Sequence, residues 1–218
     1  MENIVIYGNG SVADVTYFSF LHDSPHSIAA FTVDRDVIKE KEMFGLPVIP
    51  FDEIESSLPP EKHKIHIAIG YTRMNKLRAE KYSAAQEKGY GFASYISSKA
   101  VIGPEVILGE NCFIGPNTVI QPFVTIGNNV LIRENCTISH NSNIMDHCFI
   151  SGSVGISGNV TVEPCCFLGT NSTVRDNIRI GRECLIGAGV TLLYDTQEKE
   201  VYMNKQAQKL PFPSDKLT

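Results

Sequence analysis

The sequence predicts two domains: a small α/β domain with a Rossmann-like parallel sheet, followed by a parallel β-helix of hexapeptide repeats. Branched aliphatic residues stand at every sixth position from Ile102 to Leu192 without a break. A period of six is neither the two of a strand nor the 3.6 of a helix. It is the period of a β-helix in which each repeat forms one side of a coil. At the N-terminus, an apolar run leads into a glycine-rich turn, which is typical of a nucleotide-binding α/β unit.

The α/β elements alternate along residues 3–96. We expect strands at 3–7, 27–33, 45–50, 64–70 and 91–96, and helices at 11–21, 51–58 and 74–88. This alternation predicts a parallel sheet with helices. About 95 residues is half of a full dinucleotide-binding fold, so a nucleotide sugar or mononucleotide is a better ligand than NAD.

The turn after the first strand reads G-x-G-x-x-A and includes Gly8, Gly10 and Ser11. Its glycines would let backbone N–H groups approach a phosphate at the helix N-terminus. Asp34 ends the second strand, where a ribose hydroxyl is usually held. Arg73 and Arg78 follow a later strand and are candidate phosphate partners. The alternatives are a glycine-rich turn that binds nothing and arginines that are simply solvated.

The repeats give the β-helix a predicted interior. Two residues before each aliphatic stands a small or β-branched residue, and the sixteen repeats make about five three-sided coils. Glycine often follows the aliphatic, where we expect it to give the corner unusual backbone angles. Five cysteines lie in the small column and are expected to be structural rather than redox or metal sites: Cys112, Cys136, Cys148, Cys166 and Cys184.

The boundaries are placed at residues 1–98 for the α/β domain, 99–193 for the β-helix and 194–218 for a tail.

The net charge of −5 argues against nucleic acid as a partner. No long apolar run or signal-peptide pattern is present, so we expect a cytoplasmic protein without membrane insertion.

The candidate chemistry lies at one corner of the β-helix. The register places His140 at a coil edge, pointing outward, and an outward histidine can act as a general base. Gly158 follows eighteen residues later, one coil on, where its N–H could stabilise an oxyanion. A plain surface edge is the alternative. His140 and His147 supply at most two histidines to a zinc site of the three-histidine type, so we expect no metal.

These motifs together resemble bacterial nucleotide-sugar N-acyltransferases of the left-handed β-helix superfamily, including enzymes that acetylate UDP- or dTDP-linked 4-amino sugars. The matching stretches are the turn at Gly8–Ser11, Gly45–Val48, the hexapeptide array, Ile138–Asn141 and Ser157–Val160. The resemblance implies a left-handed coil and a homotrimer with active sites between neighbouring β-helices.

The resemblance also implies site roles. The α/β domain, with Asp34 and the Gly8–Gly10 turn, would hold the nucleotide sugar. His140 would take a proton from the sugar amine as it attacks acetyl-CoA or another acyl-CoA, and the Gly158 N–H would hold the oxyanion. Pantetheine would run past Thr170 and Ala188.

Two residues depart from the family pattern. Asn141 stands where many members have an acid after the histidine, so it can orient the imidazole but cannot stabilise its charge. Phe149 replaces a second histidine near the acyl-CoA, which indicates a different acyl group.

The main hypothesis is an N-acyltransferase for a nucleotide-linked amino sugar. The alternatives are a sugar O-acyltransferase of the sialic-acid type and a non-catalytic nucleotide-sugar-binding trimer.

Overall fold

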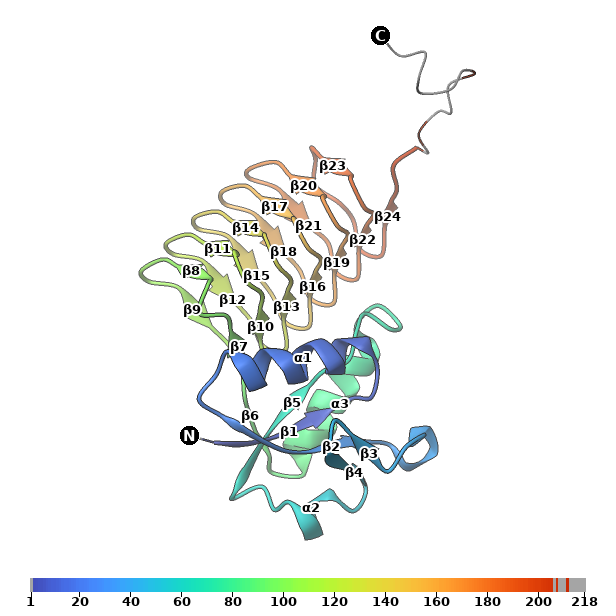
Figure 1. Cartoon of the computed structure of the whole chain (residues 1–218). Coiled ribbons are helices and arrows are strands. Elements are labelled where there is room, and N and C mark those ends of the chain that lie inside the picture. The colour runs from blue at the N-terminus through green and yellow to red at the C-terminus, as the bar shows by residue number, and fades with distance from the viewer. Residues whose placement is uncertain (1, 206, 208–210, 212–218) are drawn as a thin grey trace.

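The computed structural model describes residues 2–205, 207 and 211 of the 218 residues, and it has the two predicted domains (Figure 1). The small α/β domain contains the N-terminus, and the β-helix rises from it in a regular stack of short strands. The predicted tail, residues 194–218, is described only in part.

The α/β domain is built on a six-stranded sheet with the order β3-β4-β2-β1-β5-β6. Neighbouring strands are parallel except for the β3–β4 pair, so the predicted parallel sheet is confirmed. The strands are β1 (Asn3–Tyr7), β2 (Ser27–Val33), β3 (Glu42–Met43), β4 (Leu46–Pro50), β5 (His63–Ile67) and β6 (Gly91–Phe92). The helices are α1 (Ser11–His22), the 3-10 turn η1 (Arg35–Val37), α2 (Ile54–Ser57) and α3 (Lys76–Glu87).

The β-helix has three faces of two-residue parallel strands. Face 1 holds β7 (Tyr95–Ile96), β10 (Phe113–Ile114), β13 (Leu131–Ile132), β16 (Phe149–Ile150), β19 (Phe167–Leu168), β22 (Leu185–Ile186) and β24 (Val201–Tyr202). Face 2 holds β8 (Val101–Ile102), β11 (Val119–Ile120), β14 (Thr137–Ile138), β17 (Gly155–Ile156), β20 (Thr173–Val174) and β23 (Thr191–Leu192). Face 3 holds β9 (Ile107–Leu108), β12 (Thr125–Ile126), β15 (Asn143–Ile144), β18 (Thr161–Val162) and β21 (Arg179–Ile180). The stacking confirms the predicted left-handed β-helix.

Strand pairing follows the eighteen-residue coil. Ile114 pairs with Ile132, and Ile132 pairs with Ile150. The predicted strand at 91–96 is divided, because β6 joins the α/β sheet while β7 already pairs with β10 in face 1. The stack of the β-helix therefore begins at Tyr95, a few residues before the position taken as the boundary.

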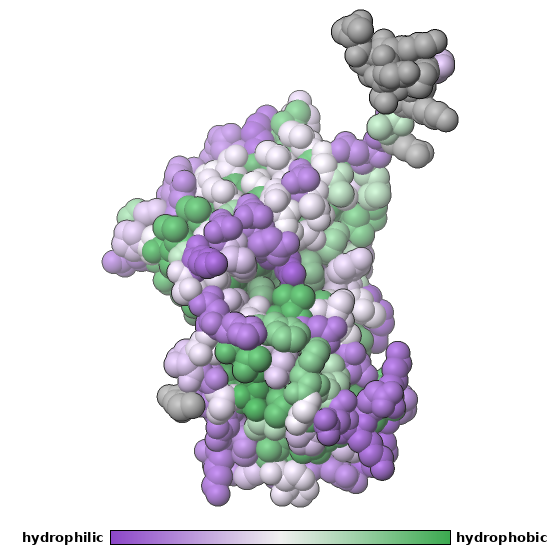
Figure 2. All heavy atoms as spheres, viewed as in Figure 1, coloured by the Kyte–Doolittle hydropathy of each residue, from purple (hydrophilic) through white to green (hydrophobic). Residues whose placement is uncertain are grey.

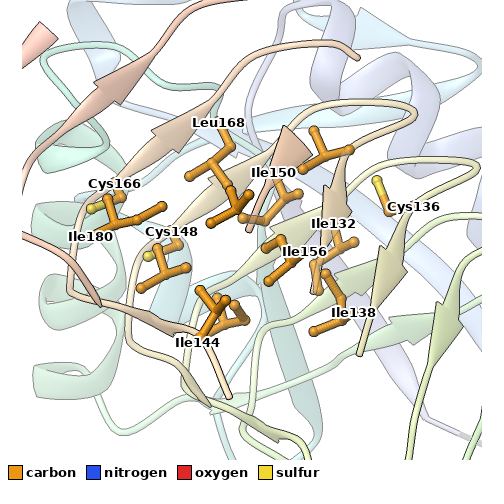
Figure 3. Close-up of a cluster of buried hydrophobic side chains, with 14 of the residues drawn as sticks. Ile132, Cys136, Ile138, Ile144, Cys148, Ile150, Ile156, Cys166, Leu168 and Ile180 are labelled. Carbon is orange, nitrogen blue, oxygen red and sulfur yellow. The ribbon is translucent and has the colours of Figure 1, made fainter. Parts of the chain in front are cut away.

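The interior of the β-helix is a column of aliphatic side chains, with the small residues beside it (Figure 3). The cysteines in the small column are free and buried, and they also hydrogen-bond. The thiol of Cys112 lies 3.1 Å from Gly127 O, and that of Cys136 lies 3.0 Å from Ser151 O. Thr118 donates in the same way, to the carbonyl fifteen residues ahead. The small column therefore supplies donors to corner carbonyls as well as filling space.

The glycines at the coil corners have a different role from the one predicted. Left-handed backbone angles do not occur at the recurring corner glycines but at another position, once in every six residues, where asparagine is common: Asn111, Asn117, Asn129, Asn135, Asn141, Asn159, Asn171 and Asn177. Asparagine tolerates this region because its short side chain bonds locally. Glycine is needed at the corner because the next coil passes close by. A Cβ on Gly115 would lie 2.7 Å from the backbone of Arg133.

The two domains meet through a buried polar seam. Asn111 accepts from Ile67 N–H at 2.8 Å and donates to the Asn129 side chain, which lies 2.9 Å from His147 Nδ1. Arg78 lies beside this ladder and is fully buried. The α/β domain is thus fastened to face 1 and to the corner between faces 3 and 1.

Part of the apolar surface of the α/β domain stays exposed. Val15, Phe18 and Leu21 on α1 are 39 to 50% exposed, and Phe44 packs edge-on against Phe18. Apolar surface on the α/β domain is visible in Figure 2, in the view in which α1 lies in front. The domain therefore does not bury all of its large apolar side chains within this chain.

Replacing Gly115 with alanine should destabilise the β-helix, because the added methyl meets the backbone of the next coil and not a movable side chain. We expect a loss of about 2 kcal/mol in the free energy of unfolding. Gly155 is the matched control, since a Cβ there meets nothing within 4 Å. Urea denaturation of both variants tests this, and equal stability of Gly115→Ala and Gly155→Ala would contradict it.

A second prediction concerns His66, which is buried between Phe20 and Phe113. Its Nδ1–H donates to Ala93 O at 2.8 Å, and burial lowers the pKa of His66 to about 4. The folded protein favours neutral His66, so this stability is complete above the unfolded pKa near 6.5 and is lost as the pH falls toward 4.

The loss should reach roughly 3 kcal/mol in the free energy of unfolding across that window. It can be measured by urea unfolding between pH 7.5 and pH 4. The His66→Asn variant keeps a donor for Ala93 but does not titrate, so its stability should fall less steeply with acid. An identical slope in the two proteins would show that His66 is not the group responsible.

Candidate functional site

A cavity of about 680 Å³ opens at the carboxyl ends of β1, β2 and β5 in the α/β domain. This is the edge of a parallel sheet where ligands bind. Its walls are the segments 7–12 and 68–72, with Asp34 and Lys81. The predicted substrate residues Gly8, Gly10, Ser11 and Asp34 therefore lie around one cavity.

The glycine-rich turn shapes one end of this cavity. Gly8 has a φ of 145°, and a Cβ there would lie 2.6 Å from Ala68 O, so only glycine fits. Gly10 is the N-cap of α1 and makes no side-chain capping bond. No described residue caps the first turn of α1 with a side chain, so its N–H groups are available to a ligand, and the helix dipole favours an anion there.

Asp34 also lines the cavity, and both of its carboxylate oxygens have donors. Tyr7 donates to Oδ1 at 2.7 Å, and Lys81 Nζ lies 2.5 Å from Oδ2. Desolvation and the adjacent Asp34 raise the pKa of Tyr7 well above its ordinary value, so the phenol remains a donor. Asp34 keeps partial exposure and can accept a further hydrogen bond from a ligand.

The two arginines singled out from the sequence do not line this cavity. Arg73 is exposed and pairs with Glu80, while Arg78 is buried in the domain seam. Tyr7 and Lys81 do line it, and sequence reasoning missed both. Tyr7 lies in the predicted strand at 3–7 and Lys81 in the predicted helix at 74–88, and no local signal marked either residue.

His140 and Gly158 are stacked neighbours, as the eighteen-residue coil predicts. A Cβ on Gly158 would lie 2.7 Å from His140 Cε1, so the imidazole packs directly on the glycine. Asn159 N–H donates to His140 O at 3.0 Å, which connects the two coils at this corner. Within the part of the chain that the structure describes, the Gly158 N–H has no acceptor.

Asn141 orients the imidazole. Its Oδ1 lies 3.0 Å from His140 Nδ1, which therefore carries the proton and leaves the Nε2 lone pair open. Asn141 itself has a φ of 58°, one of the left-handed corner positions. The asparagine thus serves the corner backbone and the histidine tautomer together.

The residues predicted to contact acyl-CoA lie at two different places. Thr170 and Ala188 are exposed and stand one coil apart at the corner between faces 1 and 2. Phe149 is buried on face 1, where its ring centre lies 5.6 Å from that of Tyr71 and 5.6 Å from that of Phe167. Tyr71 also lines the cavity, so Phe149 supports the cavity wall from behind.

The cavity and His140 lie on opposite sides of the β-helix. The α/β domain packs on face 1 through Tyr71 and on the corner between faces 3 and 1 through Arg78. His140 stands at the corner between faces 2 and 3, which is the edge opposite face 1. In one chain the cavity and the His140 corner are therefore two separate features.

Other features bear on cofactors and membranes. Among residues 2–205, 207 and 211, no three His, Cys, Asp or Glu side chains gather as they would around a metal ion. None of the helices in the described part of the chain has the length and apolar character needed to cross a membrane.

Comparisons with known proteins agree with this architecture. A family model described as the GMPPB C-terminal domain matches residues 96–191. Perosamine N-acetyltransferase from Caulobacter crescentus, solved as a variant with CoA and GDP-perosamine, has a TM-score of 0.83 and 24% identity over 92% of this chain and 93% of its own. No curated protein matches by sequence.

Two further solved structures are similar. The acetyltransferase domain of PglB from Neisseria gonorrhoeae FA1090, with acetyl coenzyme A, has a TM-score of 0.80 and 21% identity over 92% of this chain and 95% of that one. WeeI from Acinetobacter baumannii AYE has a TM-score of 0.79 and 20% identity over 92% and 96%. These likenesses establish the two-domain fold over almost the whole chain.

Proposed function

We propose that the protein is an acyl-CoA-dependent N-acyltransferase, with acetyl-CoA as the donor, acting on the amine of a nucleotide-linked amino sugar. The observation that carries this is the His140 corner: an oriented imidazole with an open Nε2 lies on a glycine whose N–H has no acceptor in the described chain. A general base beside a free backbone donor is the arrangement that acyl transfer requires.

The mechanism follows from these groups. His140 Nε2 takes a proton from the sugar amine as the nitrogen attacks the thioester carbonyl. The Gly158 N–H donates to the oxyanion of the tetrahedral intermediate. As the intermediate collapses, the C–S bond breaks and the imidazolium returns its proton to the CoA thiolate. Asn141 adds no negative charge that would stabilise the imidazolium. This suits an amine, which is already a good nucleophile, better than a hydroxyl.

The nucleotide-sugar half of the proposal rests on the cavity. A phosphate suits the N-terminus of α1, and a ribose or base suits the carboxylate of Asp34. The similar perosamine enzyme was solved with GDP-perosamine, so GDP sugars join UDP and dTDP sugars as candidates. We place the reaction in the cytoplasm.

The separation of the cavity from the His140 corner calls for more than one chain. We propose a homotrimer in which the cavity of one subunit faces the His140 corner of its neighbour, with pantetheine along the Thr170 and Ala188 corner. The exposed apolar residues on α1 are candidates for contacts between subunits.

The first test is turnover. Free CoA is followed with acetyl-CoA and UDP-, dTDP- and GDP-linked sugars that carry an amine or a hydroxyl. We expect release with an amino sugar, lowered about 10² to 10⁴-fold by His140→Ala. Gly158→Ala should also be slow, because its methyl displaces the imidazole, while Gly155→Ala should stay active. Release with hydroxyl sugars alone, or full activity of His140→Ala, would refute this proposal.

The second test is subunit mixing. Asp34→Ala and His140→Ala chains, each expected to have little activity alone, are co-expressed with different tags, and mixed oligomers are purified. If each site combines the cavity of one subunit with His140 of the next in a cyclic trimer, one of the three sites in every purified mixed trimer contains both intact halves, which is about a third of the sites. Activity near that fraction is expected. No recovery in mixed oligomers would place the whole site in one chain.

A further inference from the structure

Arg78 is a buried cation that the proposed reaction leaves unused. It lies on α3 between the domains, has 0% exposure, and has no carboxylate partner among the described residues. All its acceptors are neutral oxygens: Ile69 O, Gly70 O, Asn75 Oδ1, Asn129 O, His147 O and Cys148 O, at 2.7 to 3.4 Å. Burial lowers the pKa of Arg78 to about 10, which leaves it charged at neutral pH.

Two of these acceptors belong to the cavity wall. Arg78 Nη1 donates to Gly70 O at 3.0 Å and to Ile69 O at 3.4 Å, and both residues line the cavity. The peptide bonds are trans, so each carbonyl points opposite to the N–H of the same peptide. The N–H groups of Gly70 and Tyr71 therefore point away from Arg78. Within the described residues, neither has an acceptor.

The opposite wall is the first turn of α1, whose N–H groups have no side-chain cap among the described residues. Gly70 faces α1, since a Cβ on it would lie 3.6 Å from Val12 Cγ2 in the first turn of that helix. Lys81 is the cationic side chain of the cavity lining, and it is already paired with Asp34. An anion between α1 and Gly70–Tyr71 thus meets backbone donors rather than a free lysine or arginine.

We propose that Arg78 is a positioning residue for the diphosphate of the nucleotide sugar, acting through the peptide groups at Gly70 and Tyr71. Its charge orients and polarises the two peptides, whose N–H groups bind the diphosphate opposite the N-terminus of α1. The inference rests on the proposed function for the identity of the ligand. It names the subsite and explains why the cavity carries no exposed arginine.

The adjoining turn keeps this arrangement rigid. Arg73, Met74 and Asn75 have φ values of 54°, 53° and 64°, a run of three left-handed non-glycine residues that costs free energy. The buried Asn75 side chain donates to Cys165 O and Cys166 O at 3.1 and 3.0 Å and accepts from Arg78. The β-helix thereby fixes the segment that carries the two N–H groups.

The test varies the charge of the ligand. Dissociation constants of UDP, dTDP and GDP are measured by calorimetry on the full chain. The same measurement is then made for the monophosphate and the nucleoside that correspond to the tightest-binding diphosphate. For Arg78→Gln we expect diphosphate binding to weaken about tenfold or more, monophosphate binding to weaken less, and nucleoside binding to change about twofold at most.

Three comparisons separate this role from a structural one. Lys76→Gln removes one positive charge from the exposed surface of α3, where Lys76 pairs with Glu183. It should leave the relative affinities for diphosphate, monophosphate and nucleoside unchanged. Asn75→Gly removes the side-chain hydrogen bonds to Cys165 O, Cys166 O and Arg78 without changing the charge. It should weaken the binding of all three ligands alike. Arg78→Lys keeps the charge and should keep the preference for diphosphate, even where the melting temperature falls; it also serves if Arg78→Gln does not fold.

Equal weakening of diphosphate, monophosphate and nucleoside by Arg78→Gln would overturn the inference, as would loss of the diphosphate preference in Arg78→Lys. Wild-type protein that binds no nucleoside diphosphate would overturn it too. The proposed function is judged separately, by CoA release from the wild-type enzyme. If the wild type releases CoA but Arg78→Gln weakens the binding of all three ligands equally, the proposed enzyme activity stands and the proposed role of Arg78 is refuted. If Arg78→Gln weakens diphosphate binding most and nucleoside binding least, but the wild type releases no CoA, the role of Arg78 stands and the proposed enzyme activity is refuted.

Discussion

The hydrogen-bond ladder between coils is the constraint on which the rest of this structure depends. N–H groups of one coil donate to carbonyls of the next coil seventeen residues ahead, as in Gly115 N to Ile132 O and Gly127 N to Ile144 O, both at 2.8 Å. Each coil must then contain eighteen residues, since one insertion would turn the aliphatic column outward. This ladder aligns the aliphatic side chains, and it also stacks His140 on Gly158.

The same constraint decides how much could be predicted from the sequence. The six-residue period gave the fold, the buried cysteines and the pairing of His140 with Gly158, because all three depend on register alone. The roles of glycine and asparagine at the corners were harder. Both recur with the same period. Only the structure shows that glycine is needed at position 115 because the next coil passes close by, and that Asn117 has the left-handed backbone conformation.

Side chains that act across the domain seam could not be predicted in this way. Lys81 reaches Asp34 from α3, and Arg78 reaches carbonyls near positions 70 and 148 from the same helix. Neither pairing has a period or a short spacing. Phe149 illustrates the limit most clearly: its place in the register was correct, yet its surroundings are set by Tyr71, a residue of the other domain.

The buried seam also bears on function. A buried charge is costly, and a well-packed apolar contact would often hold two domains together as firmly. Tyr71 with Phe149 and Phe167 shows that this interface accommodates apolar contacts a short distance away. Arg78 therefore contributes something that packing does not, which is a positive charge behind the two cavity peptides. The hydrogen bonds of Arg78 serve the seam itself. In the role that we propose, its charge also serves an anionic ligand on the other side of the Gly70 and Tyr71 peptides.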